Sequence, residues 1–312
     1  MKLLVQPRDG VAPIVSGIKG AKKSIDMVIF RFDRAEIEKA LHAAILRGVN
    51  VRTLIANTNR GGEKSLRKLE ERLLEAGARV ARTADDLVRY HGKFMVIDKT
   101  TLWLFGFNFT ALDIEKSRSF GIVTKKKKTV REALNLFEAD SGRQAFESGS
   151  NVLVVSPENA REQLAAFISG AKKQLLIYDP KVSDAAMLKL LNERAKAGVE
   201  VRIIGKVGKR AVGLEHEKYP GKRLHIRAIL RDGTHAFMGS QSLRKLELDE
   251  RREVGLIVRN EHIVKQMIAT FEEDWALTDE GKQQKEEQKE AKEEKDEKEK
   301  KVERREGLGA GH

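Results

Sequence analysis

The chain has 312 residues, with 60 Lys and Arg against 47 Asp and Glu, a formal net charge of +13, 40% hydrophobic residues and no cysteine. This much apolar material can form one large core or two smaller ones, so the composition excludes a short peptide and a wholly disordered chain. The missing cysteines exclude disulfides, thiolate catalysis and cysteine-bound zinc.

No part of the sequence has the pattern of a membrane anchor. Its apolar runs are all shorter than the roughly 20 residues that a spanning helix needs. The apolar start of the chain breaks at Gln6-Pro7-Arg8-Asp9, before a signal-peptide core could form. We therefore expect a cytoplasmic protein.

The excess positive charge belongs to the part of the chain before Gly281, because the segment 281–312 holds ten basic and ten acidic side chains. A basic folded body favours an anionic partner such as a phosphodiester, a nucleic acid or a membrane surface.

Along the chain, an internal repeat appears at a constant offset of 150 in the numbering. In the first half, Gly20-Ala21-Lys22-Lys23 precedes an apolar run and a stretch of helical period, and Gly48-Val49-Asn50-Val51 opens a second apolar run. In the second half, Gly170-Ala171-Lys172-Lys173 and Gly198-Val199-Glu200-Val201 stand in the same places. Each half predicts a helix, a buried strand, an amphipathic helix and another buried strand, with glycine at the corner from helix to strand. This alternation indicates α/β layers around a sheet.

The offset changes to 134 in the C-terminal part of each half. Phe137-Glu138-Ala139-Asp140 closes the first half, and Phe271-Glu272-Glu273-Asp274 closes the second. The second half is therefore shorter in its middle, and we expect it to lack the helix predicted over 63–76.

The composition places a short polar linker over 141–151. We therefore predict one half over 1–145, a second half over 150–278, and a charged tail over 279–312. The tail has many Glu/Lys pairs but no apolar stripe, so we expect it to be disordered or a solvated helix that does not dock.

Two motifs that match each other in the repeat carry the candidate chemistry. The segment 91–98 predicts a strand, and its alternation puts His91 and Lys93 on one face, where an imidazole and an ammonium can meet one phosphate. The first motif is completed by Asp98 and Asn108. The second motif stands at the 134 offset and consists of His225, Arg227, Asp232 and Ser242.

These motifs resemble the signature of the phospholipase D superfamily, HxKxxxxD followed by GSxN, which occurs twice in one chain or once per subunit of a dimer. The resemblance spans roughly residues 1–277. The first GSxN is Phe105-Gly106-Phe107-Asn108 here, and in the second copy Arg227 replaces the lysine and Ser242 the asparagine. A later carboxylate of the family is matched by Glu253, whereas the first half has Ser119 at that place.

The resemblance implies a fold and a mechanism. The fold is α/β, with two similar phospholipase D-like halves related by a pseudo-twofold axis, mixed sheets flanked by helices, and one site at the junction. The mechanism is a displacement at phosphorus in two steps, in which one imidazole forms a phosphohistidine and the other protonates the leaving alkoxide. In the family the late carboxylate of one half orients the histidine of the other, so Glu253 is expected behind His91. This makes His91 the expected nucleophile and His225 the general acid.

The other motif residues have expected roles as well. Lys93 and Arg227 would neutralise the nonbridging oxygens, and Asn108 and Ser242 would donate hydrogen bonds to them. Asp98 and Asp232 either belong to the site or orient turns near it. Because the protein supplies two cations, we expect no metal and no cofactor.

The motif identifies only the phosphate, so it leaves the substrate open. The favoured interpretation is a phosphodiesterase or phosphatidyltransferase acting on phospholipid, with peripheral membrane contact. One alternative is a nuclease of the same fold. The other is an impaired phosphate- or nucleic-acid-binding protein, which the departures at Ser119, Arg227 and Ser242 motivate. The sequence does not distinguish hydrolysis from transfer and does not give the oligomeric state.

Overall fold

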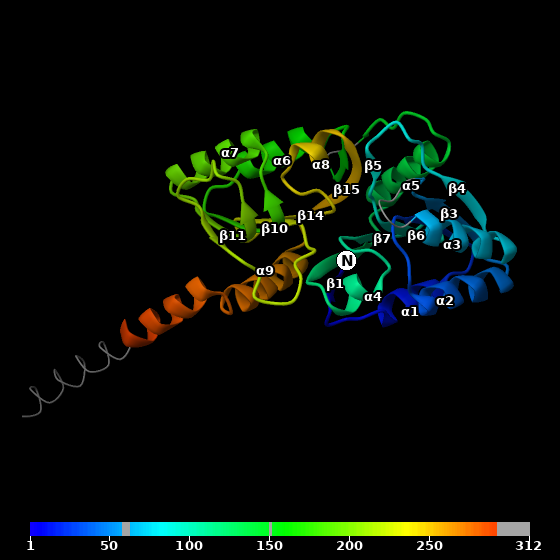
Figure 1. Ribbon diagram of the computed structural model, residues 1–312, viewed down its shortest axis with the longest axis horizontal. Coiled ribbons are helices and arrows are strands. Elements are labelled where there is room, and N and C mark those ends of the chain that lie inside the picture. Colours follow the sequence, from blue (N-terminus) through cyan, green and yellow to red (C-terminus); the bar gives the residue numbers. More distant parts are fainter. Residues whose placement is uncertain (58–62, 150–151, 292–312) are drawn as a thin grey trace, which may run out of the picture.

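The computed structural model describes residues 1–57, 63–149 and 152–291 (Figure 1). Two α/β halves lie against each other, and the C-terminal helical segment projects away from them (Figure 1). The elements of the first half are β1 (Lys2–Gln6), α1 (Ala12–Gly20), β2 (Ser24–Ile29), α2 (Ala35–Leu46), β3 (Asn50–Ile55), α3 (Glu63–Glu75), β4 (Arg79–Arg82), β5 (Arg89–Tyr90), β6 (Phe94–Ile97), β7 (Thr101–Phe105), α4 (Ala111–Glu115), β8 (Ser119–Thr124) and α5 (Lys127–Ser141).

The second half repeats this order without a helix at the place of α3. Its elements are β9 (Leu153–Ser156), α6 (Ala160–Ser169), β10 (Gln174–Val182), α7 (Ala185–Lys196), β11 (Glu200–Val207), β12 (Glu215–Glu217), β13 (Ala228–Arg231), β14 (His235–Gly239), α8 (Lys245–Asp249), β15 (Arg251–Val258) and α9 (Glu261–Trp275). Between β11 and β12 the chain forms only a loop, so the expected loss of one helix from the second half is confirmed.

Each half has one mixed sheet. The first has the order β1-β8-β7-β6-β2-β3-β4, and the second has the order β12-β11-β10-β13-β14-β15-β5, with β9 also paired to β15. In both sheets two parallel strands, β2 with β3 and β10 with β11, continue into antiparallel hairpins. The expected fold of two similar α/β halves with mixed sheets and flanking helices is confirmed.

The helices bury one face each, as their apolar spacing predicts. In α2 the buried side chains are Ile37, Ala40, Leu41 and Ala44, three or four positions apart, which is the stripe of an amphipathic helix. Helices α1, α2 and α3 enclose a core on the outer face of the first sheet. Helices α6, α7 and α8 enclose an equivalent core on the second sheet.

A third core joins the two halves. It contains residues of both sheets together with the apolar faces of α5 and α9. Because this core is continuous across the junction, side chains at the edge between the halves are held by packing from both sides.

The closing motifs fasten each half to the other. Asp274 of α9 accepts a hydrogen bond from Arg118 of the first half at 2.8 Å, and Asp140 of α5 accepts one from Arg252 of the second half at 3.1 Å. All four residues are buried or nearly so. The glutamates of the same motifs, Glu138 and Glu272, instead pair with arginines of their own half. The repeated Phe-Glu-x-Asp pattern is thus a structural feature of the junction.

The charged tail begins with a contact that its composition does not suggest. Residues 279–291 are helical, and Gly281 packs so closely on Trp275 that an added Cβ would lie 2.0 Å from the Trp275 carbonyl oxygen. Gln284 accepts a hydrogen bond from Trp275 Nε1 at 3.2 Å. Beyond residue 284 the described side chains are exposed, so only the start of the tail docks, contrary to the expectation for the whole segment. The remainder, 292–312, lies outside the described residues.

Within the part of the chain that the structure describes, no helix combines the length and the apolar character needed to cross a membrane.

Candidate active site

The two histidines lie where the chain passes from one sheet to the other. Strand β5 pairs with β15 of the second half, whereas β6 belongs to the sheet of the first half. Residues 91–93 connect them and are not in a strand. At Gly92 an added Cβ would lie 2.8 Å from Val254 Cγ2, so a glycine is needed where the chain passes the opposite half.

The prediction of one strand over 91–98 is therefore wrong at its start. The strand begins at Phe94, and His91 and Lys93 precede it. The second half has the same arrangement, since residues 225–227 precede β13 and Leu224 forms a bridge with Arg118. Backbone hydrogen bonds anchor both histidines to the opposite half, from His91 N to Arg252 O at 2.7 Å and from His225 N to Arg118 O at 3.0 Å.

Glu253 lies behind His91, as expected. Its Oε2 atom is 2.7 Å from His91 Nδ1, and its side chain is fully buried. A carboxylate at Nδ1 holds the proton on that nitrogen and leaves Nε2 with a free lone pair. Burial, together with the charges of Lys93 and Arg227, keeps the pKa of His91 well below its usual range, so the ring is neutral at pH 7. This is the state of a nitrogen nucleophile.

Ser119 occupies the equivalent place in the first half, but its hydroxyl bonds to the backbone of His225. Its Oγ donates to the His225 carbonyl oxygen at 3.3 Å. Burial and the neighbouring Arg227 also lower the pKa of His225 well below its usual range.

The two cations converge on both histidines. Lys93 Nζ donates to the His91 carbonyl oxygen at 2.5 Å, and Arg227 Nη1 donates to the His225 carbonyl oxygen at 3.4 Å. Both cations lower the pKa of each histidine, so each histidine lies within electrostatic range of Lys93 and of Arg227. Burial lowers the pKa of Lys93 to about 7 although Glu253 favours its charged form.

Asn108 and Ser242 are both buried, but Asn108 bonds to a carboxylate whereas the Ser242 hydroxyl bonds to a cation of the site. Asn108 Nδ2 donates to Asp113 Oδ2 at 2.6 Å. Ser242 Oγ accepts from Arg227 Nε at 3.2 Å, and its backbone N donates to Glu247 Oε2 at 2.6 Å.

Asp98 and Asp232 do not join the site. Each follows the far end of its strand in a left-handed turn, with φ of 53°, a conformation that aspartate tolerates better than most residues. Asp98 accepts from the backbone N atoms of Lys22, Lys23 and Ser24 at 2.6 to 3.1 Å. Asp232 makes the same contacts with residues 172–174. Of the two roles considered for these aspartates, the structure favours orienting the Gly-Ala-Lys-Lys corners.

Asp113 is the site residue that the sequence analysis missed. This α4 residue is buried, and its Oδ2 lies 3.6 Å from His225 Nδ1. Its other oxygen pairs with Arg223. Burial would raise the pKa of Asp113, but His225, Arg223 and the Asn108 amide lower it to about 2, so it is a carboxylate at neutral pH.

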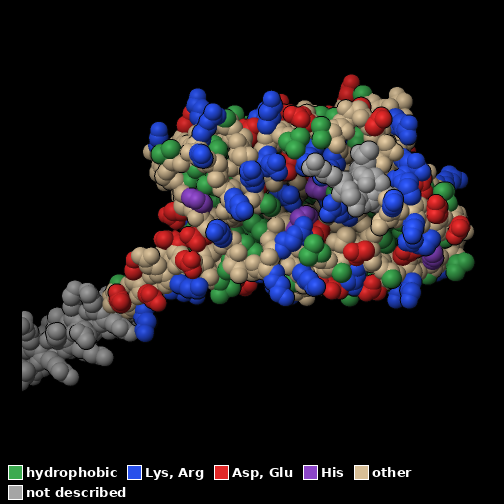
Figure 2. Space-filling view, viewed as in Figure 1, with side chains coloured by type: hydrophobic (Ala, Val, Ile, Leu, Met, Phe, Trp, Pro, Cys, Tyr) green, Lys and Arg blue, Asp and Glu red, His purple; other side chains and the backbone are tan. Residues whose placement is uncertain are grey.

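Around these residues the surface is positive. Figure 2 shows a hollow between the two halves with histidine side chains inside it and Lys and Arg side chains at its rim. Among the described residues no group of three or more His, Asp or Glu side chains has an arrangement that could hold a metal ion.

Comparison with solved structures supports this fold. Polyphosphate kinase from Porphyromonas gingivalis superimposes with a TM-score of 0.73 at 19% identity, covering 87% of this chain and 49% of the kinase. The chain thus spans about half the length of that protein. Phosphatidylserine synthase from Haemophilus influenzae Rd KW20 superimposes with a TM-score of 0.65 at 14% identity, covering 88% of this chain and 85% of the synthase. Among curated proteins no sequence matches.

A family model gives the membership directly. The model described as cardiolipin synthase, PLD-like domain, matches residues 14–141 and again 164–275, one segment in each half. Both matched segments contain one histidine and one cation of the site. The chain therefore belongs to the cardiolipin synthase, PLD-like domain family of the phospholipase D superfamily.

Proposed function

We propose that the protein is a phosphodiesterase or phosphatidyltransferase of the phospholipase D type that acts through a phosphohistidine on His91. The observation that carries the proposal is the buried junction at which His91, backed by Glu253 at 2.7 Å, and His225 both lie within electrostatic range of the same two cations, Lys93 and Arg227. Enzymes of this superfamily act on phosphodiesters, and these side chains suit that chemistry.

In the first step His91 Nε2 attacks phosphorus while the bond to the leaving oxygen breaks. His225 gives its Nε2 proton to that oxygen, and the product leaves as an alcohol. Lys93 and Arg227 neutralise the charge that develops on the nonbridging oxygens. Both cations depress the pKa of His225, so a bound phosphodiester, which offsets their charge, favours the protonated acid.

In the second step His225 accepts a proton from water or from an acceptor alcohol. The resulting oxygen nucleophile attacks phosphorus, the phosphorus–nitrogen bond breaks, and His91 is regenerated. Hydrolysis and transfer differ only in this acceptor. We take phospholipid as the first substrate class, because the matching family model is of the cardiolipin synthase type.

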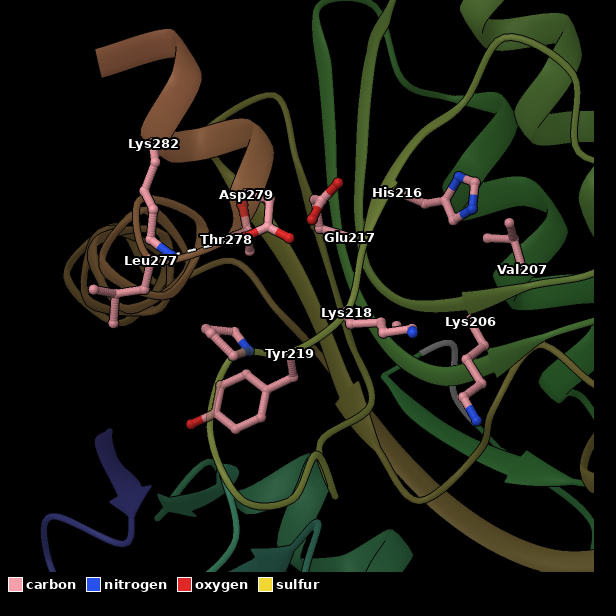
Figure 3. A pocket seen from close by; sticks show the side chains of 12 residues that line it. Lys206, Val207, His216, Glu217, Lys218, Tyr219, Leu277, Thr278, Asp279 and Lys282 are labelled. Carbon is pink, nitrogen blue, oxygen red and sulfur yellow. Dashed lines mark ion pairs between the residues drawn. The ribbon is translucent and has the colours of Figure 1, made fainter. Parts of the chain in front are cut away.

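A nuclease is the second candidate, and one pocket favours it. A pocket of about 730 Å³ lies beside the carboxyl end of β11 and is lined, among others, by Lys206, His216, Lys218 and Lys282 and by two carboxylates, Glu217 and Asp279. Figure 3 shows Lys282 paired with Asp279, at 3.7 Å, on one side of this pocket, with Lys206 and Lys218 to the right of that pair. The neighbouring Gly205 pairs with Asp179, whose carboxylate accepts from Leu243 N beside Ser242. A polyanion that continues past the scissile phosphate would meet these cations.

The test is a substrate panel run on the full chain with and without chelator. It contains anionic and zwitterionic phospholipid vesicles, single-stranded and duplex DNA, and bis(4-nitrophenyl) phosphate. Turnover of vesicles alone supports the lipid hypothesis, and turnover of DNA alone supports the nuclease. We expect activity to survive the chelator, because the protein supplies two cations. The mechanism fails if no phosphate adduct maps to His91 during turnover or if activity requires a divalent ion.

A further inference from the structure

Each histidine of the duplicated site has a carboxylate within ion-pair range, but the two carboxylates come from different places in the fold. His91 takes Glu253 of β15. The counterpart of Glu253 is Ser119, which is too short and bonds to the His225 backbone instead. His225 Nδ1 is buried and has no hydrogen-bond partner in the described part of the chain, while Asp113 Oδ2 lies 3.6 Å away.

We propose that Asp113 is the positioning residue of His225 and that its carboxylate does from α4 what a carboxylate at position 119 would do from β8. This inference rests on the proposed function, in which His225 is the general acid. With Nδ1–H directed at Asp113, the ring presents Nε2 to the leaving oxygen.

Hydrogen bonds from Asn108 and Arg223 fix the orientation of the Asp113 carboxylate. Its Oδ2 accepts from Asn108 N at 2.8 Å and from Asn108 Nδ2 at 2.6 Å, and its Oδ1 pairs with Arg223, which also donates to Ser117 Oγ at 2.9 Å. A carboxylate fixed by three donors has little freedom to turn away from His225. The 3.6 Å separation exceeds a hydrogen bond, but such contacts are often long in a free enzyme and shorten when substrate binds.

The charges that face His225 make a carboxylate necessary. Arg227, Arg223 and Lys93 oppose its protonation, and Asp113 favours it. Arg223 and Arg227 precede β13 in the second half. Lys93 precedes β6, and Asp113 lies in α4, both in the first half. A general acid must hold a proton when the leaving group departs, and among these four neighbours Asp113 alone stabilises the protonated ring.

The symmetry mate of Asp113 shows that the feature is specific to one half. Glu247 of α8 accepts from Ser242 N at 2.6 Å, as Asp113 accepts from Asn108 N. Its other oxygen, however, pairs with Arg244 and Arg251, and His91 pairs with Glu253 instead. Glu247→Gln therefore removes the same charge from the corresponding position and leaves the hydrogen-bond partner of His91 in place, which makes it the matched control for His225.

The first experiment needs no substrate. Imidazole ¹⁵N spectra of the full-length protein, with His225 assigned from a His225→Gln variant, report its tautomer and its titration. We expect the Nδ1–H tautomer in the wild type, a shift toward Nε2–H and a lower pKa in Asp113→Asn, and no change in Glu247→Gln. An Nε2–H tautomer in the wild type, or an unchanged His225 in Asp113→Asn, would overturn the inference even if the protein turns over no phosphodiester.

The second experiment uses turnover with two leaving groups. Asp113→Asn should slow release of an alkyl alcohol by on the order of a hundredfold and affect a nitrophenyl diester far less, because only the alkoxide needs a proton. Adding Ser119→Glu to Asp113→Asn should restore the alkyl substrate selectively. In the wild-type background Ser119→Glu should bring no gain, because His225 already has its carboxylate. Equal losses on both substrates, or a gain from Ser119→Glu alone, would contradict the proposal.

Discussion

Glu253→Gln removes the charge of the carboxylate beside His91 and preserves its shape. The carboxylate is fully buried and lies 2.7 Å from His91 Nδ1. In the proposed mechanism, its negative charge stabilises the imidazolium character that develops as His91 attacks phosphorus. Two opposite charges about 4 Å apart at an effective dielectric constant of about 20 attract by about 4 kcal/mol. A loss of about 4 kcal/mol corresponds to about a thousandfold slower phosphoenzyme formation.

The thermal stability of Glu253→Gln should not fall with its activity. Burial raises the pKa of Glu253, which means that the folded protein bears a cost for keeping this side chain charged. A neutral glutamine avoids that cost, so the thermal midpoint of Glu253→Gln should equal or exceed that of the wild type. A rate loss with no stability loss separates a catalytic contact from a packing contact.

The assay is single-turnover formation of the phosphoenzyme, followed by the mass of the intact protein. Glu132→Gln on α5 of the first half is a control carboxylate outside the histidine pair. A Glu253→Gln rate within tenfold of the wild type would refute the reasoning, because the buried charge would then contribute little to the transition state.

Further outcomes follow from other contacts. The low pKa of the general acid His225 already makes the kcat/KM of the wild type fall as pH rises, and loss of the Lys93 proton near pH 7 should steepen that fall. Lys93→Arg should remove the steeper part of the pH–rate profile; an unchanged slope above pH 7 would assign it to another group. Asp274→Asn should cost about 3 to 5 kcal/mol in urea unfolding, because it leaves the largely buried Arg118 without its carboxylate partner. The Arg202–Glu272 pair, whose glutamate is 43% exposed, should contribute at most about 1 kcal/mol. Deleting residues 286–312 should leave the thermal midpoint unchanged. Deleting residues 281–312 should lower the free energy of unfolding by about 1 kcal/mol, because the Trp275–Gln284 hydrogen bond is lost. Equal midpoints for the two deletions would show that this hydrogen bond does not contribute to stability.

The repeat made most of the fold predictable. Helix α7 stands at the 150 offset from α2, and every element from β6 to α5 recurs at the 134 offset in β13 to α9. Duplicated elements appear as duplicated sequence because the same apolar spacing is required twice. What the pattern could not supply was the pairing partner of β5. That strand is very short and pairs across the junction, so nothing local distinguishes it from the start of β6.

Asp113 was not predicted for the same reason, because its contacts with the second half cannot be read from local sequence. The segment Thr110-Ala111-Leu112-Asp113 has the pattern of a helix start, and Thr110 Oγ1 indeed accepts from Asp113 N at 3.2 Å. A signal was nevertheless available, because Glu247 repeats an acidic residue at the 134 offset. Only the structure reveals that Arg223, which is distant in the sequence, holds this carboxylate near His225.

The two substitutions in the second motif compensate for each other. Arg227 and Ser242 replace the lysine and asparagine of the signature, and either change alone suggests decay. In the fold, Arg227 Nε donates to Ser242 Oγ at 3.2 Å, so the shorter serine leaves room for the larger guanidinium and retains a hydrogen bond to it. An arginine also keeps its charge at any physiological pH, whereas burial lowers the pKa of Lys93 to about 7. The site thus holds one permanent cation and one that responds to a bound anion. This arrangement favours an altered but working site over a vestigial one, and it agrees with the presence of a carboxylate beside each histidine.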